Sequence, residues 1–217
     1  MTREIQKEPR WPAFVALLAN GFLYLGLPES LSLGPRWLLL AIVFALVVPM
    51  VIAHRRGHYR VNRVLTLVAN GILTIAMIAS LVFLIEGLPK HREASESLLI
   101  SAAGLWLTNI LVFALWYWRL DAGGPHGRES SAGNLRSAFL FPQMLRQDGS
   151  DPGGKVERGP WSPQFLDYLF LAFNTSTAFS PTDTAVLSRG AKLGMMAQAL
   201  ISLSILVLLA ARAVNIL

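Results

Sequence analysis

The sequence predicts an all-α, polytopic bundle of transmembrane helices with five to six hydrophobic segments. The chain has 217 residues, of which 53% are hydrophobic and 15% are charged, and its mean hydropathy is +0.49. Soluble domains carry about 25% charged residues. The shortage of charge is concentrated in long stretches with almost no charged residue, which is typical of membrane spans. The composition therefore favours a membrane protein over a soluble globular one.

Residues 1–118 form a predicted region of four transmembrane helices, arranged as two hairpins. The hydrophobic runs cover residues 12–27, 37–53, 64–85 and 97–118. The first run is short, since a helical span needs about 20 residues. A weak repeat at an offset of fifty residues relates 17–21 to 67–71, because both segments end in Ala-Asn-Gly. A duplicated hairpin and chance similarity between apolar segments both explain this repeat.

Residues 119–162 are predicted to be a polar, Gly/Pro-rich loop outside the membrane. Its apolar part, 139–144, is expected to dock against the membrane or the helices. The chain re-enters at Pro163, and 163–217 is predicted to form a pore-like helix, a turn and a final transmembrane helix over the run 191–217. Ser180, Pro181 and Asp183 are typical of a helix cap, first position and first turn. We therefore expect a helix to begin there.

The fifth hydrophobic run, 164–179, is short and leaves two topologies open. As a helix it measures about 24 Å, whereas the hydrocarbon core of a bilayer is about 30 Å thick. If the run crosses, the chain has six spans and a cytoplasmic C-terminus. If it dips in and returns, the chain has five spans and one re-entrant segment.

The distribution of Lys and Arg predicts which side of the membrane each loop faces. With four spans before the long loop, one side holds the N-terminus, the 54–63 loop and the 119–162 loop, with thirteen Lys and Arg residues. The opposite side holds three. Positively charged loops stay in the cytoplasm. We therefore expect a multi-pass protein of a bacterial inner membrane with a cytoplasmic N-terminus.

The candidate functional residues lie within the fifth run and just after it. Polar groups at membrane depth need partners in neighbouring helices, in water or in a permeating solute. A polar segment that lines an ion pathway and a span whose Ser and Thr bond back to helix carbonyls both fit this pattern. Asp167 is either a charge at a helix N-terminus or an ion or proton site. The candidate pore residues are Asn174, Thr175, Ser176, Thr177, Ser180, Thr182 and Asp183.

An enzyme is not expected, and neither is a metal site, a cofactor or nucleic-acid binding. The chain has no cysteine, which removes thiolate ligands and cysteine nucleophiles. Its four histidines all lie outside the predicted spans, so an acid–base pair inside the membrane is hard to build. The net charge of +6 reflects basic residues between hydrophobic runs, and no basic helix or aromatic-basic module is present.

The last quarter of the chain resembles the pore helix, filter and inner helix of potassium-channel-type proteins. The resemblance rests on an aromatic-rich short helix, a Thr/Ser-rich turn, Asp183, a linker with Arg189 and a long final helix. It implies a pore that admits monovalent ions. The chain departs from that pattern where channels have Gly-Tyr-Gly, because Phe179, Ser180 and Pro181 stand there. It departs in orientation too, because those channels dip from the outside, and potassium selectivity of that kind is not expected.

Most of the chain also resembles a family of uncharacterised bacterial multi-pass membrane proteins. The resemblance includes Trp161-Ser162-Pro163, Asp167-Tyr168-Leu169, the stretch 177–183 and the closing 211–215. It supports the architecture and the membrane location and implies no activity. The leading hypothesis is an oligomeric, ion-channel-like pore lined by residues 174–183, with the lipid bilayer, copies of the chain and monovalent ions as partners. The alternative is a small transporter or a structural or accessory membrane protein.

Overall fold

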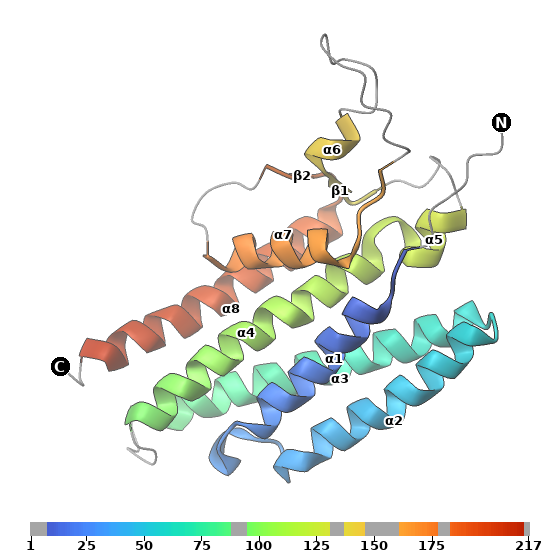
Figure 1. The fold of residues 1–217 in the computed structure, drawn as a ribbon. Coiled ribbons are helices and arrows are strands. Elements are labelled where there is room, and N and C mark those ends of the chain that lie inside the picture. The colour runs from blue at the N-terminus through green and yellow to red at the C-terminus, as the bar shows by residue number, and fades with distance from the viewer. Residues whose placement is uncertain (1–7, 88–94, 131–136, 146–160, 178–182, 215–217) are drawn as a thin grey trace, which may run out of the picture.

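The computed structural model describes residues 8–87, 95–130, 137–145, 161–177 and 183–214, and in them long helices dominate (Figure 1). The six main helices are α1 (Trp11–Leu25), α2 (Arg36–Arg55), α3 (Tyr59–Gly87), α4 (Ser95–Leu120), α7 (Phe165–Thr177) and α8 (Arg189–Val214). The short helices are η1 (Glu29–Leu31), η3 (Asp121–Gly123), α5 (Pro125–Ser130) and α6 (Pro142–Leu145). Two short strands, β1 (Phe139–Leu140) and β2 (Ala185–Val186), pair antiparallel.

Four of these helices, α2, α3, α4 and α8, are long and apolar enough to cross a membrane, and α1 is a shorter apolar helix. The predicted all-α bundle with five to six hydrophobic segments, the fifth of them short, is therefore confirmed. At 1.5 Å per residue, α3 and α4 each extend about 40 Å, whereas α1 extends about 22 Å. These helices are those of a multi-pass protein embedded in a membrane.

Helix α4 occupies the centre of the bundle. It packs against α1, α3, α7 and α8, while α2 packs against α1 and α3. The C-terminal half of α4 is correspondingly enclosed, with Val112, Ala114 and Leu115 fully buried. Consecutive helices α1 to α4 run in alternating directions along the bundle (Figure 1). Gly57, at φ +72, takes the left-handed conformation that turns the chain sharply between α2 and α3.

The start of α1, the α2–α3 turn and the end of α4 lie together at one end of the bundle, which we call the basic end. Arg10 joins them, since its guanidinium contacts His54 Nδ1 at 3.0 Å and Glu129 Oε2 at 3.0 Å. The three loops that the charge count assigned to one side therefore meet in space. Arg36 lies at the opposite end, where its guanidinium is 3.5 Å from the carboxylate of Glu29.

The predicted loop 119–162 is partly folded where the structure describes it. It contains η3, α5, β1 and α6, and its apolar segment docks against the helices, as expected. Phe139 is only 1% exposed and contacts the rings of Tyr117 and Tyr168 edge-on. β1 and its neighbours therefore tie this connection to α4 and α7.

The predicted helix start at residues 180–183 is wrong. Asp183 lies in a bend and is followed by strand β2, and α8 begins only at Arg189. Ser188 is its cap: the backbone N–H of Ala191 donates to Ser188 Oγ at 3.1 Å. The pairing of β2 with β1 takes the backbone groups that the sequence pattern assigned to a helix. Ser180, Pro181 and Thr182 lie outside the described residues.

Helix α7 runs antiparallel to α4. At its start, the Tyr168 hydroxyl reaches Asp121, at the end of α4. Near its end, Phe173 contacts Trp106, about 21 Å further down α4. Helix α8 runs the same way, because it begins at the basic end beside β2 and descends along α4 (Figure 1). Strand β2, paired with β1, therefore lies near the start of α7 and not near its end.

Candidate functional site

A buried polar cluster joins α4, α7 and α8 about halfway along the bundle. Its centre is Gln198, which is 0% exposed. The Gln198 amide nitrogen donates to the carbonyl oxygen of Ala172 at 2.7 Å and to Ser176 Oγ at 2.8 Å. Its amide oxygen accepts from the Tyr117 hydroxyl at 2.6 Å. One α8 side chain thus hydrogen-bonds to both neighbouring helices, and its own polar groups are all satisfied.

Ser202 extends the cluster by one turn. Its hydroxyl donates to the carbonyl oxygen of Ser176 at 2.7 Å and accepts from the indole N–H of Trp106 at 3.1 Å. The last four carbonyls of a helix lack partners within that helix. Ser202 satisfies one of them, so α8 stabilises the end of α7 at a depth where water is scarce. Asn109 adds a bond from α4 to the Gln198 carbonyl oxygen at 3.3 Å.

The four candidate pore residues of α7 point in different directions. Ser176 is buried in the cluster, whereas Asn174 and Thr175 are half-buried and Thr177 is exposed. Thr175 Oγ1 and Thr177 Oγ1 donate back to the carbonyl oxygens of Leu171 and Phe173. These back-bonds fit the packing alternative of the sequence analysis. They leave Thr177 at the surface of the single chain.

The remaining predicted site residues lie elsewhere. Asp183 is exposed beside β2, and Ser180 and Thr182 are outside the described part of the chain. Asp167 sits in the first turn of α7, where its Oδ2 accepts the backbone N–H of Gln164 at 2.7 Å. A carboxylate in that position satisfies a free donor and interacts favourably with the helix dipole. The structure therefore brings Asn174 to Thr177 together at one helix end and places Asp167 at the other.

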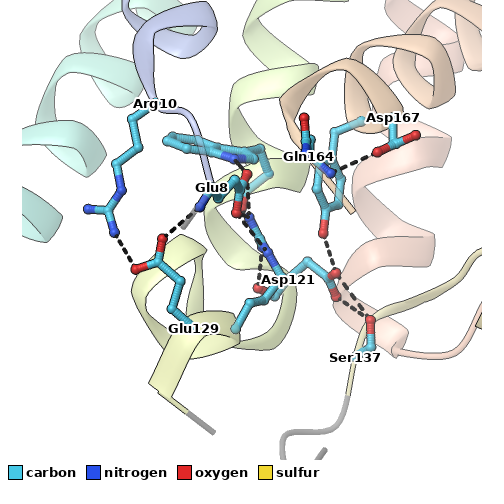
Figure 2. A network of polar contacts seen from close by, with 10 residues as sticks. Glu8, Arg10, Asp121, Glu129, Ser137, Gln164 and Asp167 are labelled. Carbon is cyan, nitrogen blue, oxygen red and sulfur yellow. Dashed lines mark hydrogen bonds and ion pairs between the residues drawn. The ribbon is translucent and has the colours of Figure 1, made fainter. Parts of the chain in front are cut away.

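A second polar cluster anchors the start of α7 at the basic end (Figure 2). Asp121, directly after α4, is fully buried. Its Oδ2 accepts from the Tyr168 hydroxyl at 2.6 Å, and its Oδ1 accepts from Ser137 Oγ at 2.8 Å and from the backbone N–H of Ala138. The Asp121 carboxylate thus connects the end of α4 with α7 and with the segment before β1.

The N-terminal segment joins this cluster through Glu8. Its carboxylate lies 2.9 Å from Arg128 Nη2 and accepts from the Trp118 indole N–H. Arg128 also donates to the carbonyl oxygens of Trp118 and Asp121 and stacks its guanidinium over the Tyr168 ring at 5.1 Å. Burial raises the pKa of Glu8 above its usual value, although the Arg128 charge opposes the shift. The cluster therefore binds together segments that are far apart in the sequence.

Sequence reasoning missed most residues of both clusters. In the sequence, Gln198 and Ser202 are only polar residues within the apolar last run, and Asp121 stands among the other polar residues of a loop. The signal that was available is the adjacency of Asp121 to the aromatic end of α4, where a buried acid needs donors. In the described part of the chain, no group of three or more His, Asp or Glu side chains is placed to hold a metal ion.

Comparison with known proteins finds no matching family model, no similar curated protein and no similar solved structure. The resemblances to potassium-channel-type pores and to uncharacterised bacterial membrane proteins therefore stay predictions from the sequence.

Proposed function

We propose that this protein is a homo-oligomeric membrane protein in which the ends of α7 from several copies form an ion-channel-like pore. The observation that carries the proposal is the position of Thr177, an exposed residue at the end of a helix that stops about halfway along the bundle. A single copy offers this helix end on its outer surface. Several copies around an axis would bring the ends together.

The bilayer gives a physical reason for an assembly. Helix ends carry unsatisfied carbonyls, and non-helical backbone at membrane depth is tolerated only inside protein or beside a water-filled cavity. Ser202 satisfies one carbonyl at the α7 end, and lipid offers no hydrogen-bond partner for the others. Contacts with a second copy, or water in a pore, would supply them.

The electrostatics of the helix end suit a cation. A helix C-terminus carries a partial negative charge, and the nearby hydroxyl of Thr177 and amide of Asn174 are oxygen ligands of the kind that line cation paths. The outer side of α7 before that end is apolar, with Leu166, Phe170 and Phe173 at 70%, 65% and 45% exposed. In the proposed assembly this apolar stripe packs against the next copy, while the polar end faces the axis.

The orientation follows from the exposed basic residues. Arg55, Arg56, Arg60 and Arg63 lie exposed at the basic end, and Arg189 begins α8 there. By the positive-inside rule this end faces the cytoplasm. The proposed topology therefore has five spans in a bacterial inner membrane, a cytoplasmic N-terminus and a re-entrant α7 that enters from the cytoplasm.

The test measures assembly and flux on the same full-length protein. We would determine its mass in lipid nanodiscs and its monovalent-cation flux in liposomes. The Thr175→Val and Thr177→Val variants should each reduce flux by up to roughly tenfold, the loss expected from one hydrogen-bonding ligand. Ser101→Ala is the matched control, because Ser101 is buried in α4 and also bonds back to its own helix, at 2.7 Å.

The results separate the pore from the alternatives. An oligomer that conducts, with flux reduced in the Thr variants only, supports the pore. Flux that is unchanged in Thr175→Val and Thr177→Val contradicts it, and so does a protein that stays monomeric and passes no ions.

A structural or accessory membrane protein is the second candidate. The buried cluster favours it, because Ser176, Gln198 and Ser202 use their polar groups to join helices instead of presenting them to a solute. An oligomer that forms through the α7 stripe but passes no ions would make this the leading function. A small transporter would require α7 to change its contacts with α8 during transport.

A further inference from the structure

The last turn of α4 carries a buried arginine without a neutralising partner. Arg119 is 6% exposed, its Nε is fully buried without a hydrogen-bond partner, and its guanidinium makes no ion pair with any residue that the structure describes. A buried, unpaired charge is costly. An anion from outside the chain would neutralise this charge and supply the missing hydrogen-bond acceptor.

The other charged residues at this end add positive charge and offer Arg119 no free acid. Further positive charges lie at this end of the bundle: Arg10, Arg128, and Arg63 on α3, the helix that packs against α4. The acids that the structure describes at this end are engaged elsewhere: Glu8 binds Arg128, Glu129 binds Arg10, and Asp121 binds Tyr168 and Ser137. Arg119 on α4 and Arg63 on the neighbouring helix α3 are therefore two arginines of this end that form no ion pair with any residue that the structure describes.

The turn after α4 lies close against Arg119. Gly124, at φ +83, lies so close that a Cβ there would be 2.9 Å from the Arg119 carbonyl oxygen and 3.6 Å from its Nη1. Only glycine fits this approach and this backbone conformation without strain. Any larger residue at position 124 would therefore push against the Arg119 carbonyl and guanidinium.

The pair lies where a bilayer surface should be. Below Arg63 on α3, Val64 and Val68 are 58% and 45% exposed, and Leu120 next to Arg119 is 58% exposed. Large apolar side chains exposed along a membrane span contact lipid tails. Arg63 itself is exposed at the top of this apolar face, at the level that lipid headgroups occupy.

We propose that Arg119 and Arg63 bind the phosphate of an acidic phospholipid headgroup at the basic end of the bundle. Guanidinium groups bind phosphate oxygens through paired, charge-assisted hydrogen bonds, and basic pockets between transmembrane helices on the cytoplasmic side hold such headgroups. The lipid supplies the missing anion, and its acyl chains cover the apolar face of α3.

The test compares lipids by their effect on the thermal stability of the full-length protein in detergent. Phosphatidylglycerol should raise the unfolding temperature, whereas phosphatidylcholine and inorganic phosphate should not. The apparent affinity for phosphatidylglycerol should fall by about tenfold or more in Arg119→Gln and in Arg63→Gln, because each loses a charged hydrogen-bond donor. Arg189→Gln, which removes an exposed arginine at the start of α8, should bind as the wild type does.

Stability without lipid provides the second readout. Arg119→Gln should be at least as stable as the wild type in lipid-free detergent, because it removes an unpaired buried charge. A loss of stability there would mean that the arginine serves the fold itself, and would overturn the proposal. Equal stabilisation by phosphatidylcholine would overturn it, as would an unchanged affinity in both variants. The same effect from inorganic phosphate alone would overturn the lipid assignment.

Discussion

Replacing Gln198 by leucine removes a side chain that connects α8 with both α4 and α7 and keeps nearly the same volume. Three hydrogen bonds are lost, with Tyr117, Ala172 and Ser176. Hydrogen bonds between membrane helices contribute about 0.6 kcal/mol each on average, which gives about 2 kcal/mol. The buried Tyr117 hydroxyl is then left without its partner, which adds about 1–2 kcal/mol. We therefore expect the free energy of unfolding to fall by about 3–4 kcal/mol.

Reversible unfolding of the full-length protein in mixed micelles measures this change. Gln143→Leu is the matched control, because Gln143 lies exposed in α6 and should alter stability by less than about 0.5 kcal/mol. If Gln198→Leu is no more destabilising than this control, the cluster does not hold α7 against α8. The account of why α7 ends at mid-depth would then be refuted.

Two further predictions concern the basic end. Asp121→Asn should lower the free energy of unfolding by about 1–3 kcal/mol and speed proteolysis of 137–145, because the Asp121 carboxylate that accepts from Tyr168 is weakened. The control Asp183→Asn, at an exposed residue, should change neither quantity. Equal proteolysis of the two variants would contradict the anchoring role of Asp121. The second concerns pH. Burial raises the pKa of Glu8 from 4.5 despite Arg128, so the folded state holds this proton at a higher pH than the unfolded state does. Stability from Glu8 should therefore be lost as the pH rises through the folded pKa, and the unfolding midpoint of Glu8→Gln should show a flatter dependence above pH 4.5. An identical slope in the variant would contradict it.

The span pattern could be predicted from the sequence because each long apolar run has one stable outcome in a bilayer. The predicted runs match α1 to α4, α7 and α8 to within a few residues, apart from α3. That helix begins at Tyr59, inside the basic cluster that the sequence suggested was a loop. Arginines at a helix end keep their charge in water while the backbone stays helical, so a charged stretch does not by itself end a helix.

The two polar clusters could not be predicted, because they depend on contacts between distant residues. Gln198 meets Ala172 and Ser176 only after the chain has doubled back, and Glu8 meets Arg128 across 120 residues. The error at Asp183 has a similar origin. A local capping pattern favoured a helix start, but pairing of β2 with β1, a partner 45 residues earlier, decided the local structure.

The central claim is that α7 enters from the basic end and the chain returns to the same end. Because the chain has no cysteine, single cysteines placed at Ser162, Asp183 and Leu33, all exposed, can be labelled in intact cells and in inverted vesicles with an impermeant reagent. The account predicts that Ser162→Cys and Asp183→Cys react from the cytoplasmic side and Leu33→Cys from the opposite side. Labelling of positions 162 and 183 from opposite sides would mean that the segment between them crosses the membrane, and would contradict the account.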